Sequence, residues 1–537
     1  MFKNLTVVLL QTILLFFSFM AWSCTAVKPP SEVMNYPAAS PDSSKVFTAD
    51  EIHKDDNTTE LSKQDNQGPI EVGIEETVLM AMQNNQGLVV EKMNPLIQKT
   101  FEEQEQSVFD PVFGAGLSNK RSVAERLSRA GSATESSTVD TMDGSAYIDK
   151  LFPTGTNLSL LGSTNIVDSS LYSDKLASTR LGLTVTQAIL QGADIKANTA
   201  SIQQAWIDTR ISEYELRGFA ELLLEAVESA YWNLAMAERR IEIYNDSLTL
   251  AEKQMSEVQE RIKIGKLAET ELAAAQAEVA LRRENLINAR SDLAKAQLVF
   301  LQILNPGGNN MWDRKIVLKN QPMAPDVELD KIEEHVKVAM IKRADLNQAR
   351  REVEKGELEV IKTKNGILPK LDFFITFGKT GYSGVFNESV KNVGGDSYDV
   401  VGGLALEYPP LNRQARALHH RAVLTKQQAI EAVHNLTQIV EVDVRSAYIE
   451  VNRAKEQISA TAATRKLQEE KLRAENEKFR VGKSTSLLVA QAQRDLVASQ
   501  ITEIEAVVTY LKALVNLHRM EGSLLDRRGI NTPGNRQ

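Results

Sequence analysis

Apolar side chains recur every three or four residues over long stretches, which predicts helices of unusual length. Segments 194–263 and 411–481 contain no proline, and Gly218 is the one glycine within them. At about 1.5 Å per residue, each segment would form a helix of roughly 100 Å. Shorter helices are expected at about 75–109, 268–304, 330–367 and 485–522. The two short helices of each half add up to about one long helix, so they are expected to lie end to end beside it.

The short helix that follows the first long helix carries a heptad seam. Apolar residues fill it at Leu272, Val279, Leu286, Leu293 and Phe300, and three residues later at Ala275, Ala289, Ala296 and Ile303, with Arg282 as the exception. Such a repeat predicts a left-handed coiled coil. The spacing continues ahead of Gly265, at Leu248, Ala251, Met255, Val258 and Ile262. Gly265 and Gly482 are therefore expected to be the turns of two antiparallel coiled-coil hairpins.

Strict alternation of apolar and polar residues predicts strands within about 111–190 and 369–408. Leu371, Phe373, Ile375 and Phe377 share one face, as do Tyr398, Val400, Leu404, Leu406 and Tyr408, whereas Leu181, Leu183, Val185 and Ile189 alternate with Arg180, Thr184 and Thr186. The pattern fits a half-buried sheet of a soluble domain, or strands of a membrane barrel with apolar residues outside. Four such strands are too few to close a barrel, so a barrel would need several chains.

The chain is an internal duplication. "VESAYWNL" at 227–234 corresponds to "VRSAYIEV" at 444–451, and Gly265 corresponds to Gly482, both at an offset of 217 residues. Nearer the N-terminus Pro111 pairs with Pro369 at an offset of 258, so the first copy holds 41 extra residues. The expected organisation is an export signal at 1–23, an acidic tether at 24–70, the first copy at 71–304, a linker at 305–329, the second copy at 330–522 and a tail at 523–537.

The N-terminus predicts export. An apolar run from Leu5 to Trp22 follows Lys3, and the sole cysteine, Cys24, stands where cleavage would fall. The alternative is a transmembrane anchor, since the run is just long enough to span a bilayer. Cys24 after "AWS" also resembles a bacterial lipoprotein cleavage box, although Ala21 and Trp22 depart from it. This resemblance implies a diacylglycerol anchor at Cys24.

Composition and motifs argue against an enzyme and against nucleic acid as a partner. The net charge of -9 provides no basic face for phosphates. Gly482-Lys483-Ser484 imitates a phosphate-binding loop, but Glu477 occupies the position of its first glycine. The six histidines lack metal-site or catalytic-triad spacing and are expected on solvated surfaces. We therefore expect no catalytic residue, no metal and no cofactor.

The duplicated layout, the junctions "TQAILQG" and "YPPLNR", "LPKLDF" before a strand, and "FRVGKST…LLVAQAQ" at the turn together resemble the TolC-like outer-membrane efflux proteins. The resemblance covers about 75–525. It implies a homotrimer in which each chain gives four strands to a 12-stranded barrel, with long helices forming a tapering periplasmic tunnel. It also implies an equatorial region around 305–329 and 523–537. The expected fold class is thus mainly α, a coiled-coil tunnel with membrane β-strands.

The sequence departs from this family at two places. The extra residues include "SAYIDKLFPTGTNLSLLGSTN", 145–165, which predicts an added hairpin. We expect it at the barrel rim or in an outer loop rather than in the wall. Some relatives narrow the entrance with acidic residues six and nine positions after the second tip glycine, but Leu488 and Gln491 stand there. Glu271 is the one acidic residue at a matching position of the first copy, so an acidic ring is not expected.

The resemblance implies a passive exit duct in the outer membrane of a Gram-negative bacterium. Its tips, Gly265 and Lys266 with Gly482 and Lys483, would dock to a periplasmic adaptor that joins an inner-membrane transporter. Efflux and type I protein secretion both fit such a duct. The alternative function is a periplasmic coiled-coil adaptor or scaffold without a channel.

Overall fold

A computed structural model describes residues 69–127, 134–170, 174–306, 311–325 and 328–530, and these contain two very long helices. Helix α6 (Ala200–Lys263) has 64 residues and α11 (Arg413–Arg480) has 68. Each turns back into a helix of 35 residues, α7 (Thr270–Leu304) and α12 (Ser486–Met520). The predicted stretch 194–263 differs slightly, because the short helix α5 (Ile195–Asn198) precedes α6. In the described part of the chain, no helix combines the length and apolarity that crossing a membrane requires.

Each hairpin turn is a glycine-terminated helix end. Gly265 and Gly482 have φ values of 70° and 76°, the left-handed region that glycine adopts without steric cost. The Lys266 amide donates to Arg261 O at 2.8 Å, and the Lys483 amide donates to Lys478 O at 2.8 Å. These bonds satisfy carbonyl groups that a helix end leaves unpaired. The predicted hairpin turns are therefore present at both glycines.

The predicted leading helices are each broken in two. The first is α3 (Ile74–Asn84) and α4 (Gln86–Gln106), and the second is α8 (Ile332–Lys342) and α9 (Ala344–Asn365). The breaks fall at Asn85 and Arg343, whose backbones are extended and which lie 258 residues apart. Asn85 accepts from the Leu88 amide at 3.1 Å, which caps the new helix. The duplication thus extends to the position of the helix break.

The heptad seam packs as predicted, with one polar insertion. Val279, Leu286 and Phe300 of α7 are buried, and α7 packs against α6. Arg282, the exception in the seam, is also buried and forms an ion pair with Glu278 one helical turn away. The larger core gathers around Tyr231 and Leu234 of α6, where the helices meet the small parallel pair β1 (Ile70–Val72) and β6 (Ile316–Leu318). This pair joins the start of the first copy to the predicted linker.

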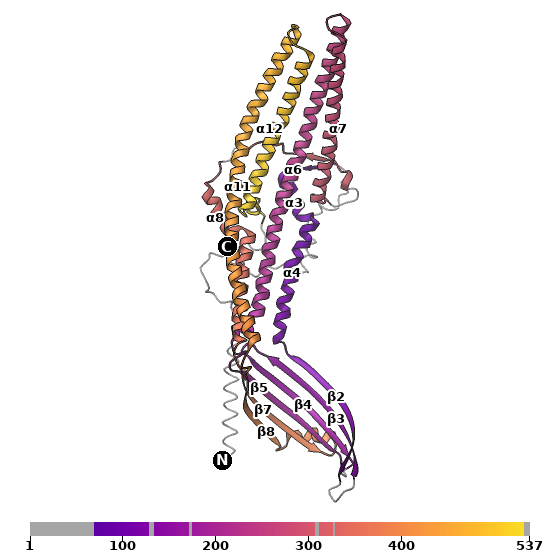
Figure 1. Ribbon diagram of the computed structural model, residues 1–537. Coiled ribbons are helices and arrows are strands. Elements are labelled where there is room, and N and C mark those ends of the chain that lie inside the picture. Colours follow the sequence, from indigo (N-terminus) through magenta and orange to yellow (C-terminus); the bar gives the residue numbers. More distant parts are fainter. Residues whose placement is uncertain (1–68, 128–133, 171–173, 307–310, 326–327, 531–537) are drawn as a thin grey trace. The chain divides into compact units, whose positions relative to one another are not determined.

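The other six strands form one antiparallel sheet at one end of the helices (Figure 1). Its order is β2 (Val112–Leu127), β3 (Thr134–Leu151), β4 (Thr156–Ser169), β5 (Leu176–Ala188), β7 (Lys370–Ser383) and β8 (Tyr398–Glu407). The sheet has six strands, so the expected four strands per chain is wrong. The expectation that 145–165 lies at a rim or loop is also wrong, because these residues form most of the β3–β4 pair inside the sheet. A short helix, α10 (Phe386–Lys391), lies between β7 and β8 in sequence.

Candidate functional site: the hairpin tips and the two-faced sheet

The two hairpin tips present similar turns to solvent. Lys266 and Lys483 are exposed beside their glycines, as are the predicted aperture residues Leu488 and Gln491. The Ser484 hydroxyl donates to Glu475 at 2.8 Å and Lys478 donates to the same carboxylate at 2.6 Å. These bonds, that from Lys478 foremost, hold the pKa of Glu475 below its ordinary value. The Gly-Lys-Ser sequence therefore ends a helix and ties its hydroxyl to a carboxylate.

The tips of the two hairpins are joined to each other. The Ser486 hydroxyl of α12 donates a hydrogen bond to the Glu271 carboxylate of α7. Arg261 of α6 donates to Phe479 O at 3.3 Å, and its guanidinium lies 4.7 Å from the centre of the Phe479 ring. An apolar cluster of Val258, Leu472, Phe479, Val489 and Ala492 lies beneath these contacts. Of the three aperture candidates, Glu271 thus binds the other hairpin, whereas Leu488 and Gln491 remain at the surface.

The sheet has one apolar and one polar face. The strand register aligns an apolar row across all six strands, formed by Phe113, Ile148, Leu160, Leu183, Phe377 and Val400. The opposite face carries a polar row, formed by Ser118, Asp143, Asn165, Ser178 and Tyr382. Four residues of this row, Asp143, Asn165, Ser178 and Tyr382, help to line a concavity of about 470 Å³. Apolar side chains on one face and polar ones on the other are typical of a strand wall between lipid and water.

An ion pair crosses the polar face over a glycine. Arg180 of β5 reaches across β7 and donates through Nη2 to Asp399 of β8 at 2.7 Å. Gly378 lies beneath the guanidinium, where an added Cβ would be 2.4 Å from Arg180 Nη2. The alternation predicted that Arg180 points away from the apolar side. It could not predict that the two residues meet, since they are 219 positions apart.

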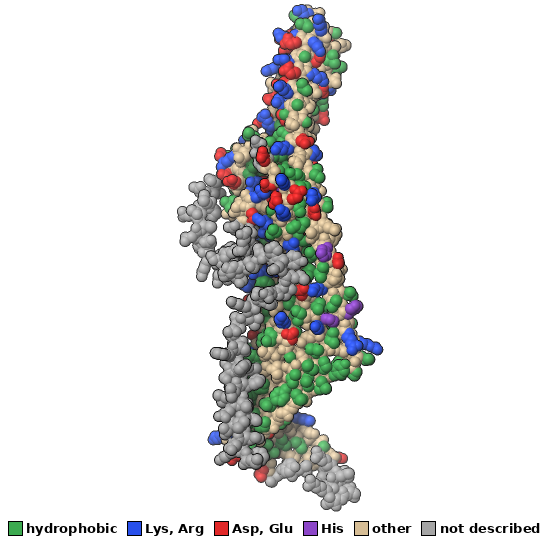
Figure 2. All heavy atoms as spheres, turned by 90° about the vertical axis from the view of Figure 1, so that its left-hand side faces the viewer, with side chains coloured by type: hydrophobic (Ala, Val, Ile, Leu, Met, Phe, Trp, Pro, Cys, Tyr) green, Lys and Arg blue, Asp and Glu red, His purple; other side chains and the backbone are tan. Residues whose placement is uncertain are grey.

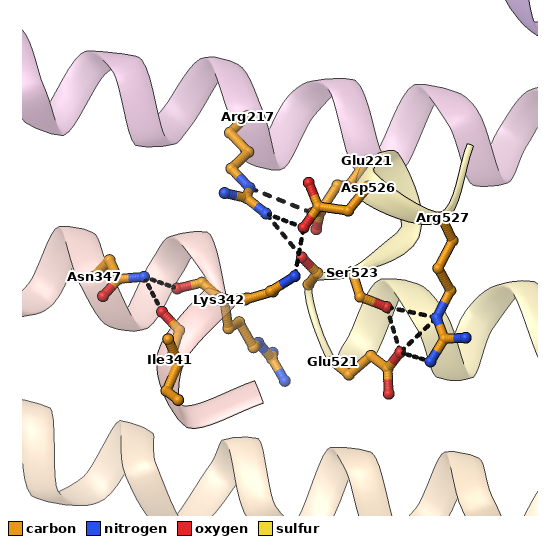
Figure 3. A network of polar contacts seen from close by, with 11 residues as sticks. Arg217, Glu221, Ile341, Lys342, Asn347, Glu521, Ser523, Asp526 and Arg527 are labelled. Atoms are coloured by element: carbon orange, nitrogen blue, oxygen red, sulfur yellow. Dashed lines mark hydrogen bonds and ion pairs between the residues drawn. The ribbon is translucent and has the colours of Figure 1, made fainter. Parts of the chain in front are cut away.

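A buried polar network fixes the C-terminal segment where the two copies meet (Figure 3). Arg217 of α6 lies 3.6 Å from Asp526 of α13 (Leu524–Arg527), and Lys342 donates to the same carboxylate at 2.7 Å. Nearby, Glu521 is fully buried and accepts from Arg527 Nε at 3.1 Å. His335 is buried against Glu521 as well, so the prediction that all histidines lie on solvated surfaces is wrong for His335.

Two titratable groups of this network have shifted pKa values. Burial, followed by the positive charge of Arg527, lowers the pKa of His518 to about 4. Burial alone would raise the pKa of Glu521, but hydrogen bonds from His335 and Ser523, together with the positive charge of Arg527, lower that pKa. The network is therefore arranged around a carboxylate that stays charged and a histidine that stays neutral.

Comparison with known proteins decides the family. The sequence profile described as outer membrane efflux protein matches residues 150–305 and 336–523. The chain belongs to this family. It is therefore an efflux channel of the Gram-negative outer membrane that extends into the periplasm, and it is not an enzyme. No curated protein sequence matches the chain.

Solved structures of bacterial membrane proteins share the fold. A membrane protein from Pseudomonas aeruginosa has 17% identity and a TM-score of 0.62, covering 85% of this chain and 92% of its own. The Campylobacter jejuni channel CmeC has 14% identity and a TM-score of 0.61, covering 84% and 86%. VceC of Vibrio cholerae has 14% identity and a TM-score of 0.61, covering 84% and 96%. At these identities the likeness concerns the fold alone.

Proposed function

We propose that three copies of this efflux protein assemble into a passive exit duct, which receives its cargo from an inner-membrane transporter through a periplasmic adaptor. The observation that carries the proposal is the two-faced sheet with two unpaired edges. In the described residues β2 and β8 pair on one side only. A single sheet of this kind exposes backbone groups at both edges, and lipid has no hydrogen bonds to offer them. Closure by further copies satisfies them.

The helices next to those edges support the same assembly. On α4, Val90, Met93, Ile97 and Phe101 are exposed, and at 100° per residue they fall within an arc of about 80°. On α11, exposed Leu424, Ile439, Val442 and Ile449 also fall within about 80°. Figure 2 shows hydrophobic side chains gathered over the lower half of the α11 side, with charged ones nearer the tips. The flanks differ from each other, so copies contact each other head to tail, which is the kind of contact that builds rings.

The proposed duct takes its energy from its partners. Gly482-Lys483-Ser484 forms a helix-ending turn, and its serine is bonded to Glu475, which would repel a phosphate. We propose that the exposed tips at Gly265, Lys266, Gly482 and Lys483 dock to the adaptor. Leu488 and Gln491 would narrow the entrance by apolar and amide contacts, without an acidic ring, and Glu271 would hold the two hairpins together. Cys24, outside the described residues, would carry the lipid anchor.

Planar-bilayer recording tests the duct. The purified protein should give stepwise single-channel currents, because a closed ring of two-faced sheets encloses water. A scaffold or adaptor without a channel would give none, and that result would refute the proposal. A parallel preparation in which Val442→Glu blocks ring closure serves as the control for contaminating porins.

Crosslinking at the tips tests the docking surface. A photoreactive group at Lys266 or Lys483 should capture a periplasmic adaptor from cells, whereas the same group at Lys455, on α11, should not. Identification of the captured adaptor would separate efflux from type I secretion. Capture at Lys455 alone would contradict docking at the tips.

A further inference from the structure

We infer that the barrel of this protein has eighteen strands, six from each of three copies, with β2 of one copy paired to β8 of the next. The inference rests on the proposed trimer and concerns the width of its bore. The family resemblance implies twelve strands, so the added β3–β4 hairpin would make this outer-membrane pore substantially wider. A second copy of this chain is the partner that each sheet edge fits.

The added hairpin spans the full depth of the sheet. The β3–β4 ladder runs from Leu151↔Asn157 at the helical end to Val139↔Ser169 at the far end. The β5–β7 ladder covers nearly the same length, from Ala188↔Asp372 to Ala177↔Ser383. A tilted strand needs about 9–11 residues to cross the hydrocarbon layer, and β3 and β4 both exceed this length. The hairpin is therefore long enough to be part of the membrane wall.

The added strands also keep the two faces in register. Ile148 and Leu160 continue the apolar row between Phe113 and Leu183. Asp143 and Asn165 continue the polar row, and the Asn165 amide donates to Asp143 at 2.6 Å. A hairpin folded over a rim or into a loop would not need this alternation. The pattern indicates contact with lipid on one side and water on the other.

The inner turn of the hairpin is fastened to the base of the sheet. Asn198 of α5 donates to Pro153 O at 2.8 Å, and Gln187 of β5 donates to Thr154 O at 3.0 Å. Gly155 has a φ of 74°, and a Cβ there would lie 2.0 Å from Gly192 O. Glycine thus allows the turn to approach the junction between β5 and α5. These bonds hold β3 and β4 in the sheet at the helical end.

Strand direction allows copies to join at the free edges. β2 leads away from the helices and β8 leads back toward them, at opposite sides of the sheet (Figure 1). An even number of alternating strands makes β8 antiparallel to β2 of the next copy. The polar face of β2, with Ser118 and Ser122, then continues the polar face of β8, with Asp399 and Glu407. The polar face of one copy therefore continues into the polar face of the next, and the apolar faces do the same, without a one-residue shift in strand pairing.

The circumference of the helical ring accommodates eighteen strands. Each chain brings α4, α6, α9 and α11 to the junction with the sheet, so three copies bring twelve helices. Twelve helices about 9–10 Å apart need a ring of roughly 110–120 Å. Eighteen strands about 4.8 Å apart and tilted by about 40° occupy roughly 110 Å, whereas twelve occupy only about 75 Å. The bore can therefore pass from the helices into the barrel without narrowing.

Paired cysteines can count the strands in the assembled protein. If the helical ends of β2 and β8 lie at the same depth in the membrane, Ser118 lies opposite Val401 of the next copy. A shift of two residues in the pairing would place it opposite Gly403 instead. Double variants Ser118→Cys with Val401→Cys or Gly403→Cys should give covalent dimers and trimers when outer membranes are oxidised. The matched control pairs Val401→Cys with Ser163→Cys on β4, which should give no crosslinks between chains.

The possible outcomes distinguish failure of the eighteen-stranded barrel from failure of the proposed trimer. Crosslinks through Ser163→Cys would show that β2 and β3 lie outside a twelve-stranded wall, and would overturn the inference while leaving the duct intact. An intact trimer on native gels with no crosslink at either β2–β8 pair would overturn it as well. A monomer on native gels would instead refute the proposed assembly. Each single-cysteine variant shows the background from native Cys24.

Discussion

Single residues fix the two hairpin tips. Gly482 adopts a φ of 76°, and an added Cβ would meet no atom within 4 Å. Gly482→Ala should therefore destabilise the α11–α12 hairpin by about 1 kcal/mol, through backbone strain alone. Gly218→Ala is the matched control, since its Cβ would lie 3.7 Å from Ala344 Cβ within a helix and should be neutral or stabilising. Thermal unfolding of the purified protein measures both, and equal effects would contradict the role assigned to the turn.

The buried C-terminal network makes stability depend on pH. Unfolded His518 takes up a proton near pH 6.5, but the folded protein keeps it neutral until the pH reaches about 4. Folding is therefore disfavoured progressively as the pH falls between these values. The lowered pKa of Glu521 acts in the same direction, because its stabilising charge is lost on acidification.

His518→Gln should flatten this dependence. The thermal midpoint of the wild-type protein should decrease from pH 7 to 4, and that of the variant should decrease less. His434→Gln, at an exposed position of α11, should leave the wild-type slope unchanged. An unchanged slope in His518→Gln would show that this histidine is not the group that titrates.

At the scale of elements, the unbroken long helices set the geometry of the tunnel. Ala251 of α6 and Ala454 of α11 are buried in helix interiors. Proline at either position would remove a backbone hydrogen bond and clash with the preceding turn, at a cost of about 3 kcal/mol or more. We expect Ala251→Pro or Ala454→Pro to abolish trimer assembly on native gels. Gln86→Pro, at the first position of α4 after the extended Asn85, should be tolerated.

At the scale of the whole molecule, the exposed stripes of α4 and α11 determine assembly. Ile449 is 65% exposed in the single chain. Burying such a side chain between copies is worth about 1.5–3 kcal/mol, and a buried charge would cost more. Ile449→Glu should therefore shift the protein from trimer to monomer in native electrophoresis. Thr464→Glu, at an exposed position nearer the tip, should leave the trimer intact. If neither Ile449→Glu nor Thr464→Glu formed a trimer, the added charge itself would be the cause.

The sequence alone determined the features that depend on near neighbours. Helical periodicity predicted α6, α7, α11 and α12 to within a few residues, and glycine chemistry predicted the turns at Gly265 and Gly482. Alternation assigned Phe373 and Leu404 to one face, because side chains in a strand must point to opposite sides in turn. The duplication was legible because both copies repeat the same local patterns.

Only the tertiary structure decided which distant segments meet. Alternation within 145–165 predicted strands, but their partners, β2 and β5, lie elsewhere in the chain. The same local pattern therefore fits a hairpin at the barrel rim and a hairpin in the barrel wall. The same holds for Arg180 with Asp399, Glu271 with Ser486, and His335 with Glu521. Pairing over such separations depends on the summed packing of whole elements, which leaves no local pattern. The sequence therefore predicted a duct-forming architecture, and the structure revealed the six strands of its wall.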